Sequence, residues 1–308
     1  MPKAKGLFVG MTTLDCIYRA EHPPTANEKV VAQKSLMVAG GPATNASVAF
    51  AQLGRENQAI LSSVIGEHPL STLLREDLQG QGVTLSDLDA QRLSPPPVSS
   101  IVVSASSGER AVISRNAENM QIAADQVSQE MLDGIDIVLI DGHQMAVGAQ
   151  VAQWAKGRQI PVVVDAGSWK PNFDTVLSHA DVVVASANFS PPDCGNSAAV
   201  FDYLKAQQVK KIAITQGSSP VLYFDAEGED EQTGEVDVPQ IRAVDTLGAG
   251  DIFHGAFCHF FLTHTFEETL MKASRTASFA CQHWGTRDWT KIYRITDDDD
   301  DSDEEMAN

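Results

Sequence analysis

A seven-residue segment in the last quarter of the chain combines glycines with carboxylates. It reads Asp245-Thr246-Leu247-Gly248-Ala249-Gly250-Asp251 and leads into an apolar helical pattern. Small residues at 248–250 allow a tight turn whose amides lack intrahelical partners, so the amides and the helix dipole would stabilise an anionic phosphate. Asp251 could then accept a proton from an alcohol that attacks phosphorus, while Asp245 would brace the loop or help hold a cation. A helix cap after a simple turn is the alternative.

A second glycine-containing segment lies near the N-terminus. Gly40 and Gly41 precede a predicted helix that runs to Leu53, and Asn45 lies one turn into that helix. Paired glycines let the backbone approach a ligand closely, and an asparagine offers a donor and an acceptor to sugar hydroxyls. Asp15 follows the first apolar run and is expected near the same strand ends. Neither glycine segment is specific by itself.

Short apolar runs alternate with amphipathic segments along the chain. The runs are Gly6–Gly10, Ala59–Val64, Ile137–Ile140, Pro161–Asp165, Asp181–Ala185 and Lys211–Thr215. The helical patterns are Ala43–Leu53, Leu70–Gln81, Ala123–Leu132, Val147–Lys156 and Ala198–Gln207. Strands that are apolar on both faces and separated by helices predict an α/β fold, with a central, mostly parallel sheet flanked by helices.

Two segments interrupt this alternation, near residues 16–38 and 99–115, and have the pattern of extended or hairpin structure. In the second, two short apolar runs flank a turn at 106–108, and three prolines at 95–97 give a stiff extended entry. Two hairpins inserted into a parallel domain would form a small β lid. We expect the lid to cover the strand ends, where open α/β sheets bind ligands, and to exclude water there.

The charge of the chain limits its partners. The 308 residues include 22 basic and 41 acidic residues, a formal charge of −19, which repels phosphate backbones and anionic headgroups and so excludes nucleic acid and membrane surfaces. Eight of the carboxylates lie between Asp297 and Glu305, which leaves 22 basic against 33 acidic residues, or −11, elsewhere. We therefore expect a folded domain over 1–296 and a disordered acidic tail over 297–308 that aids solubility.

Cysteine usage and hydropathy predict the compartment. Four cysteines without C-x-x-C spacing are too few to form a disulfide framework in a chain of this length. The first apolar run is too short for a signal peptide, and no apolar stretch reaches membrane-spanning length. We therefore expect a cytoplasmic protein.

Together, the two glycine segments resemble the two signature motifs of the ribokinase-like carbohydrate kinases, also called the phosphofructokinase B family. The similarity runs through Asp15, the glycine pair with Asn45, Asp165, Thr215-x-Gly217 and the segment 245–251, and so covers nearly the whole folded chain. It implies a ribokinase-like fold with a β lid and the transfer of phosphate from ATP to a sugar.

The resemblance also implies roles for the matching residues. Asp251 would be the base that deprotonates the sugar hydroxyl, and the amides of Gly248, Ala249 and Gly250 would bind the transferred γ-phosphate. Sugar binding is implied for Asp15, Gly40, Gly41 and Asn45, and nucleotide binding for Asn188, Thr215, Gly217 and Ser274, the last near the adenine. Mg²⁺ would bridge the phosphates, and K⁺ would be held largely by carbonyls, including those of Asp245 and Leu247.

Three positions depart from the family pattern. Asn188 is followed by Phe-Ser-Pro instead of the N-x-x-E glutamate that helps to position magnesium, and the nearest carboxylate is Asp193. Pro220 stands where the nucleotide loop commonly has a second glycine. Ribokinases proper carry a lysine after the glycine pair, so Pro42 argues against ribose as the substrate.

Within the family, the motifs most resemble those of the sulfofructose kinases. Lys29 matches a lysine that helps to bind the anionic group of the substrate in that branch. The expected lid asparagine and the arginine after the third core strand are replaced by Ser114 and by residues near His143, so the sulfonate pocket is incomplete.

Other residues near these motifs have simpler interpretations. His254, one turn past Asp251, is expected to pack in the core, since no second histidine or cysteine stands at a metal-chelating spacing in the sequence. Trp284, Trp289 and Arg287 could stack on a base, although a closing hydrophobic flap is the more common role.

The sequence thus predicts an ATP-dependent sugar kinase that phosphorylates a primary hydroxyl of a ketose or related sugar, with Asp251 as the base. Two alternatives stay open: a nucleoside kinase with the same chemistry, and a regulatory module that binds sugar or nucleotide with little turnover. If the lid sheet exposes its edges, pairing across a two-fold axis would cover them, so we expect a homodimer through the lid.

Overall fold

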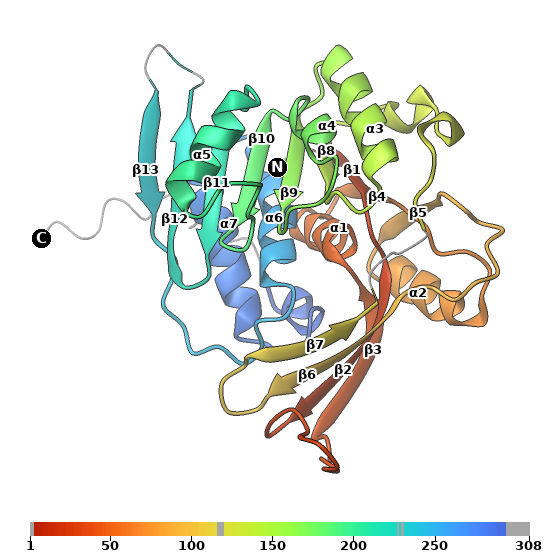
Figure 1. Cartoon of the computed structure of the whole chain (residues 1–308). Coiled ribbons are helices and arrows are strands. Elements are labelled where there is room, and N and C mark those ends of the chain that lie inside the picture. Colours follow the sequence, from red (N-terminus) through yellow and green to blue (C-terminus); the bar gives the residue numbers. More distant parts are fainter. Residues whose placement is uncertain (1–2, 116–119, 227, 229–230, 294–308) are drawn as a thin grey trace, which may run out of the picture.

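The fold is built around a large, mostly parallel sheet (Figure 1). The computed structural model describes residues 3–115, 120–226, 228 and 231–293. Within these residues nine strands pair in the order β13-β12-β11-β10-β9-β8-β1-β4-β5, of which β12 and β13 pair in antiparallel fashion and the others in parallel. Their bounds are β1 (Lys5–Val9), β4 (Gln58–Ser63), β5 (Val83–Asp87), β8 (Ile137–Ile140), β9 (Val162–Ala166), β10 (Val182–Ser186), β11 (Lys211–Gln216), β12 (Ser219–Asp225) and β13 (Gln232–Val236).

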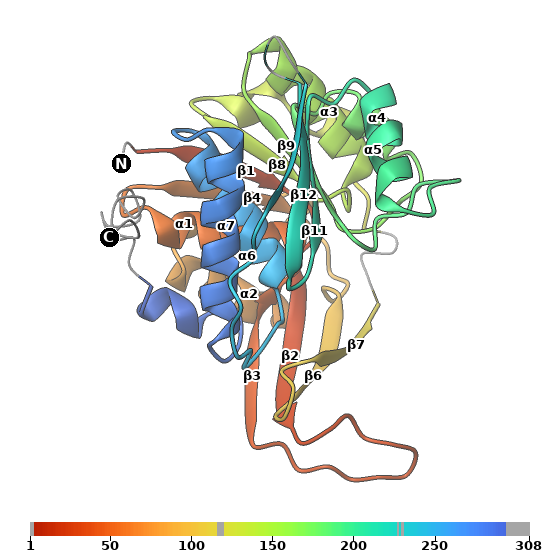
Figure 2. The same ribbon diagram turned by 90° about the vertical axis from the view of Figure 1, so that its left-hand side faces the viewer.

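Helices cover both faces of this sheet, as Figure 2 shows. One face carries α1 (Pro42–Leu53), α2 (Pro69–Gly80), α6 (Ala249–Phe261) and α7 (Phe266–Cys281), and the other carries α3 (Met145–Gly157), α4 (Asp174–Leu177) and α5 (Ser197–Ala206). The central strands have to be apolar on both faces: in β9 and β10, Val162–Val164 and Val182–Val184 are fully buried and contribute to both hydrophobic cores. The predicted α/β fold is therefore confirmed.

The helix predicted over 123–132 is wrong. The segment instead forms two short 3₁₀ helices, η1 (Ala124–Gln126) and η2 (Gln129–Leu132), with extended backbone at Val127. Only Leu132 of these ten positions is fully buried, and Val127 and Met131 pack partly buried against the same core. This small apolar surface does not stabilise a full helix.

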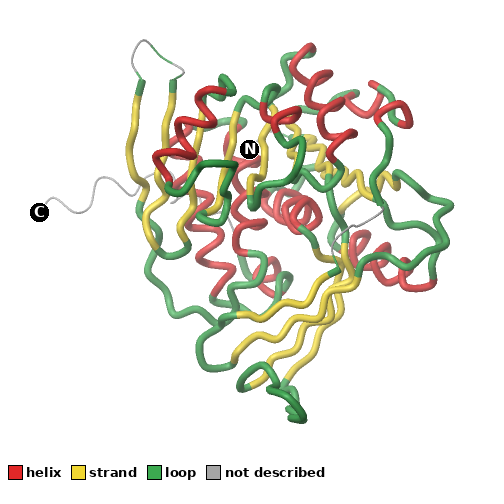
Figure 3. The backbone as a smooth tube through the Cα atoms, viewed as in Figure 1, coloured by secondary structure: helices red, strands yellow, loops and turns green. Residues whose placement is uncertain are grey.

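The two interrupting segments form one four-stranded sheet beside the main sheet, visible as a separate group of strands in Figure 3. Its strands are β2 (Thr13–Ala20), β3 (Lys34–Gly40), β6 (Val98–Ser104) and β7 (Arg110–Ser114), in the order β3-β2-β6-β7. Ile17, Val38, Ile101 and Val103 point to one face and pack there with Leu247 and Trp284. The lid therefore contacts the segment that leads into α6.

The lid grows directly from the strand ends of the main sheet. The chain passes from the end of β1 into β2 and from β3 into α1, so the polar residues at these junctions meet at one edge. The loop 21–33 joins β2 to β3 and extends beyond the lid strands, away from the main sheet (Figures 1 and 2). The predicted acidic tail over 297–308 lies outside the described residues.

Candidate active site

The N-terminus of α6 has the geometry expected of an anion site. Gly248 is the residue that caps the helix, in the left-handed region with φ of 71°, and no side chain caps the first turn. Ile252 N–H donates to the Gly248 carbonyl at 2.8 Å, and Ala249 N–H makes only a long bond of 3.4 Å to the Thr246 carbonyl. Within the described residues, the amides of Gly250 and Asp251 have no hydrogen-bond acceptor. These amides are available to a ligand.

Asp251 lies in this first turn and is partly buried. Its Oδ2 accepts a hydrogen bond from Asn45 Nδ2 at 2.8 Å, which joins α6 to α1. Burial and, second, the negative charge of Asp165 raise the pKa of Asp251 to about 7, and the bond from Asn45 opposes this rise. A carboxyl group that titrates near neutral pH is suited to accept a proton during turnover.

The glycine pair holds the backbone close to Asp15. Asp15 is a buried residue of β2 whose Oδ1 accepts a bond from Thr13 Oγ1 at 2.6 Å. A Cβ on Gly40 would lie 1.9 Å from Asp15 Oδ2, so any side chain there would have to displace the Asp15 carboxylate. Burial raises the pKa of Asp15, while hydrogen bonds from Thr13 and Ser99 act in the opposite direction. The structure thus brings Asp15 and the glycine pair together.

Asp141 organises the same strand ends, although the sequence analysis does not select it. Its Oδ2 accepts from the amides of Met11 at 2.9 Å and Ala43 at 3.1 Å, and its Oδ1 accepts from the amide of His143 at 2.8 Å. From its position directly after β8 it caps α1, which explains why Gly41, the N-cap of α1, needs no side chain for that purpose. A carboxylate directly after a buried strand is the sequence signal that points to it.

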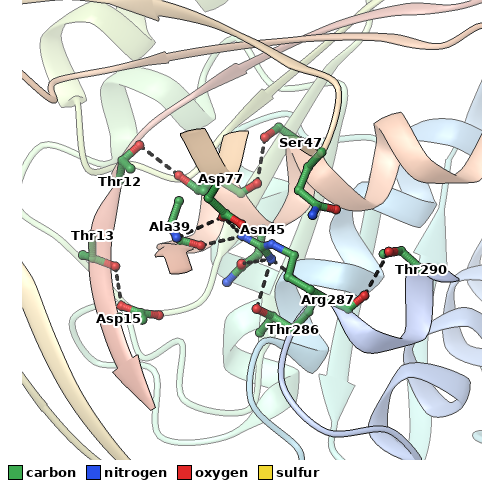
Figure 4. Close-up of polar contacts among 12 residues, drawn as sticks. Thr12, Thr13, Asp15, Ala39, Asn45, Ser47, Asp77, Thr286, Arg287 and Thr290 are labelled. Carbon is green, nitrogen blue, oxygen red and sulfur yellow. Dashed lines mark hydrogen bonds and ion pairs between the residues drawn. The ribbon is translucent and has the colours of Figure 1, made fainter. Parts of the chain in front are cut away.

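Arg287 is the second residue whose role the sequence analysis misses (Figure 4). It is buried, so it cannot stack on a base, and its Nη1 donates to Asn45 Oδ1 at 3.0 Å. Its Nη2 donates to the Ala39 carbonyl at 2.5 Å and to Asp77 Oδ2 at 3.2 Å. Burial lowers the pKa of Arg287, and the Asp77 carboxylate opposes that shift. A buried ion pair therefore lies directly behind Asn45.

The loop before α6 is braced by Asp245. Its Oδ1 accepts from Leu247 N–H at 2.9 Å and its Oδ2 from Gly285 N–H at 2.9 Å. Burial raises the pKa of Asp245, whereas these two amide bonds lower it. The lid reaches the same loop, because Arg110 Nη1 donates to the Thr246 carbonyl at 3.2 Å. Both carboxylate oxygens of Asp245 are thus used within the protein.

The residues expected to bind nucleotide lie at the ends of neighbouring strands. Thr215 is near the end of β11, Gly217 has φ of 64° in the turn to β12, and Asn188 is exposed just beyond β10. The amide of Ala187, the residue before Asn188, donates to the Thr215 carbonyl at 2.9 Å. This bond joins the end of β10 to the end of β11. Ser274 is buried in α7, and its hydroxyl has no partner within the described chain.

The other predicted substrate residues divide into two groups. Ser114 lies on the inner face of the lid, where Ser99 Oγ donates to it at 3.2 Å, beside Asp15. Lys29 is exposed in the loop 21–33, and no hydrogen bond or ion pair connects it to the rest of the described chain. Within one protomer, Lys29 is therefore not brought together with the other sugar-binding candidates.

His254 packs in the core, as the sequence predicts. Its Nδ1 lies 2.7 Å from the Gly250 carbonyl, and its Nε2 lies 3.2 Å from the Val184 carbonyl and 3.6 Å from Asp165 Oδ1. Trp289 is also buried, with 1% of its surface exposed. Neither side chain is open to a ligand.

Comparison with known proteins decides the family. Residues 3–292 match the pfkB family carbohydrate kinase model. The chain belongs to the pfkB family of carbohydrate kinases. It is 23% identical over 286 residues to the ribokinase of Bacillus subtilis, covering 91% of this chain and 93% of that one. It is 25% identical over 267 residues to the ketohexokinase of Mus musculus, covering 83% of this chain and 88% of that one.

The fold comparison agrees with the family assignment. The structure of Arabidopsis thaliana ribokinase complexed with ribose and ATP superposes with a TM-score of 0.71 at 22% identity, covering 92% of this chain and 94% of that chain. This pfkB-family kinase therefore has the ribokinase-like fold and carries out ATP-dependent phosphorylation of a sugar.

ATP and Mg²⁺ are typical of the family. Among the described residues, no group of three or more His, Cys, Asp or Glu side chains could hold a metal ion. Mg²⁺ usually keeps several waters and takes few protein ligands, so it would not require such a group. None of the described helices is long and apolar enough to cross a bilayer.

Proposed function

We propose that this kinase transfers the γ-phosphate of ATP to a primary hydroxyl of a ketose or related sugar, with Asp251 as the general base. The observation that supports it most is the first turn of α6, where a partly buried carboxylate with a pKa of about 7 lies beside amides that have no acceptor within the described residues. The mouse ketohexokinase among the relatives supports a ketose, and Pro42 in place of a lysine argues against ribose.

The reaction follows from this geometry. The sugar hydroxyl oxygen attacks the γ-phosphorus, its proton passes to Asp251 Oδ1 or Oδ2, and the bond to the bridging oxygen breaks so that its electrons remain on ADP. The amides of Gly248, Ala249 and Gly250 stabilise the negative charge on the transferred phosphoryl oxygens, assisted by the dipole of α6. The bond from Asn45 keeps the carboxylate oriented towards the sugar.

Residues at the ends of the same strands would hold the two substrates. Asp15, Gly40, Gly41 and Asn45 would hold the sugar under the lid, and Asn188, Thr215, Gly217 and Ser274 would hold the nucleotide. Mg²⁺, when bound, would offset the charge of the phosphates. Because both Asp245 carboxylate oxygens already accept amide bonds, the carbonyls of Asp245 and Leu247 are the groups left for a monovalent cation, and carbonyl oxygens suit K⁺.

The outer face of the lid supports a homodimer. Tyr18, Met37 and Ile113 point away from the inner cluster and are 38%, 61% and 78% exposed. Pairing of two lids would cover these side chains. It would also bring Lys29 of one copy near the other copy, which a role in binding an anionic sugar substituent requires. Sedimentation of wild type as a dimer and of Ile113→Asp as a monomer would support this assembly, and a monomeric wild type would exclude it.

The substrate class is tested by coupled ADP formation with fructose, tagatose, ribose, sulfofructose, sugar phosphates and nucleosides, in K⁺ and in Na⁺. We expect the highest kcat/KM with a ketose, and ³¹P-coupled ¹³C NMR of the product should show phosphate on a primary carbon. Turnover of nucleosides alone would instead identify a nucleoside kinase. Binding without ADP formation under any metal condition would identify a regulatory module. The cytoplasmic location stays a prediction.

A further inference from the structure

We propose that Arg287 is a positioning residue that fixes the side-chain amide of Asn45 and, through it, the carboxylate of Asp251. The inference rests on the proposed role of Asp251 as the base. Three groups form a continuous line: Arg287 Nη1 donates to Asn45 Oδ1 at 3.0 Å, and Asn45 Nδ2 donates to Asp251 Oδ2 at 2.8 Å. Arg287 therefore acts on the reacting carboxylate through one intervening side chain.

The chemistry of the two ends determines which way the amide of Asn45 points. A guanidinium has only donors, so the atom of Asn45 that meets Arg287 has to be the carbonyl oxygen. The NH₂ group then faces Asp251, where an ionised carboxylate offers only acceptors. A flipped amide would set NH₂ against the guanidinium and oxygen against the carboxylate, two repulsive contacts in a buried site.

The guanidinium is itself held in place by an ion pair from α2 (Figure 4). Asp77 Oδ2 accepts from Arg287 Nη2 at 3.2 Å and from the Ala39 amide at 3.0 Å, while Arg287 Nη2 donates to the Ala39 carbonyl at 2.5 Å. The side chains of Arg287 and Asp77 are 6% and 16% exposed. Both polar groups of Ala39, the residue before the glycine pair, are therefore bound to this ion pair.

Loss of the guanidinium would release the amide of Asn45. The amide could then rotate and present its oxygen to Asp251, which disfavours the ionised carboxylate that accepts the proton. Turnover should fall, and the acid limb of the pH profile should move to higher pH. The charged or titratable groups that face Asp251 are Asp165 of β9, His254 of α6, Arg110 of β7 and Arg287, and those that face Arg287 are Asp77 of α2, Asp15 of β2 and Asp251.

The test is a double-mutant cycle read out by pH profiles. Arg287→Gln should lower kcat about tenfold, leave the KM for ATP unchanged, and shift the acid limb of kcat/KM upwards. In an Asn45→Ala background the same substitution should change kcat less than about twofold, because Arg287 acts through Asn45. Arg75→Gln is the control, since Arg75 lies on α2, as Asp77 does, and forms an ion pair with Asp87, but has no hydrogen bond to Asn45.

A second variant keeps the test decisive if Arg287→Gln does not fold. Asp77→Asn removes the charge that anchors the guanidinium but keeps an acceptor, and it should move kcat and the acid limb in the same direction by a smaller amount. Wild-type kcat and pH profile in a folded Arg287→Gln, or in Asp77→Asn, would overturn the inference. Additive effects with Asn45→Ala, or an equal loss in Arg75→Gln, would overturn it as well.

The outcome for Asp251 separates this inference from the proposed function. If Asp251→Asn is inactive while Arg287→Gln behaves as wild type, only the positioning role fails. If Asp251→Asn turns over as wild type, the proposed base is wrong and the positioning role fails with it.

Discussion

The N-termini of α1 and α6 have similar backbone geometry but different roles. Each helix starts at a glycine with positive φ, 101° at Gly41 and 71° at Gly248, and neither has a side-chain cap. At α1 the first turn already binds a carboxylate of the protein itself, since Asp141 Oδ2 accepts a hydrogen bond from the Ala43 amide at 3.1 Å. At α6 the amides of Gly250 and Asp251 have no acceptor within the described chain.

The difference separates a structural helix terminus from a ligand-binding one. The carboxylate of Asp141, directly after β8, satisfies α1, so its first turn is a fixed support that places Asn45. The terminus of α6 stays unsatisfied until a phosphate arrives, which is the property that transition-state stabilisation requires. Changes at the first turn of α6 should therefore affect turnover directly, whereas changes at α1 should affect stability, sugar binding or, through Asn45, the orientation of Asp251.

Among changes at the glycines of the two helix termini, a side chain at Gly248 should have the largest effect. A Cβ there would lie 2.9 Å from Thr286 Cγ2, and alanine is strained at φ of 71°. Gly248→Ala should distort the anion site and lower kcat about a hundredfold. Gly157→Ala, where a Cβ meets no atom within 4 Å, is the control. A Gly248→Ala enzyme with unchanged kcat would contradict the assignment of the anion site.

A smaller effect on kcat/KM is expected when the pH is lowered below neutral. Because the pKa of Asp251 is raised to about 7 and the base must be ionised, kcat/KM should be constant above neutral pH and fall about tenfold per unit below it. Melting temperatures over the same range separate this loss from unfolding. A flat profile between about pH 5 and 8 would show that no group of this kind limits turnover.

A change in the glycine pair before α1 should mainly affect the KM for the sugar. In Gly40→Ala the new Cβ would displace the carboxylate of Asp15, whose Oδ2 lies 1.9 Å from that position. We expect the KM for the sugar to rise about tenfold and the KM for ATP to stay within about twofold. Gly80→Ala, whose Cβ meets no atom within 4 Å, is the control. An equal rise in both KM values would show that the glycine pair does not act on the sugar alone.

The smallest effect is expected at Pro220. The strand register shifts between Ile214 and Gln216, and Gln216 Nε2 donates to the Pro220 carbonyl at 2.9 Å, so the proline fits at an irregularity of the sheet. Pro220→Gly should therefore change the KM for ATP by less than about twofold. An improvement greater than about tenfold would show that this departure from the family pattern weakens nucleotide binding.

Much of the fold is predictable because local patterns report burial. Apolar runs such as Ile137–Ile140 have to be covered on both faces, and the structure confirms them as strands of the main sheet. The turn at 106–108 and the two lid segments are likewise confirmed as hairpin structure. The helix predicted over 123–132 is wrong, because only Leu132 of the segment is fully buried and this leaves little apolar surface to stabilise a full helix.

The site is only partly predictable, because its supporting contacts connect distant parts of the chain. The glycine motifs identify Asp251 and Asn45, but Arg287 meets Asn45 across 242 positions and Asp141 meets Met11 across 130. No local periodicity encodes such pairs. Lys29 is the opposite case, a residue that a local motif predicts at the site but that the fold does not place there. It is exposed in the loop 21–33, which extends beyond the lid strands, away from the main sheet.

The most direct measurement compares Asp251→Asn with Asp141→Asn in kcat and melting temperature. Asp251→Asn should keep the fold and lose about a thousandfold in kcat, because the base is gone. Asp141→Asn should lose about 2 kcal/mol of unfolding free energy, because an amide cannot accept all three amide bonds, and should keep kcat within about threefold in the folded enzyme. Wild-type turnover by Asp251→Asn would contradict the account.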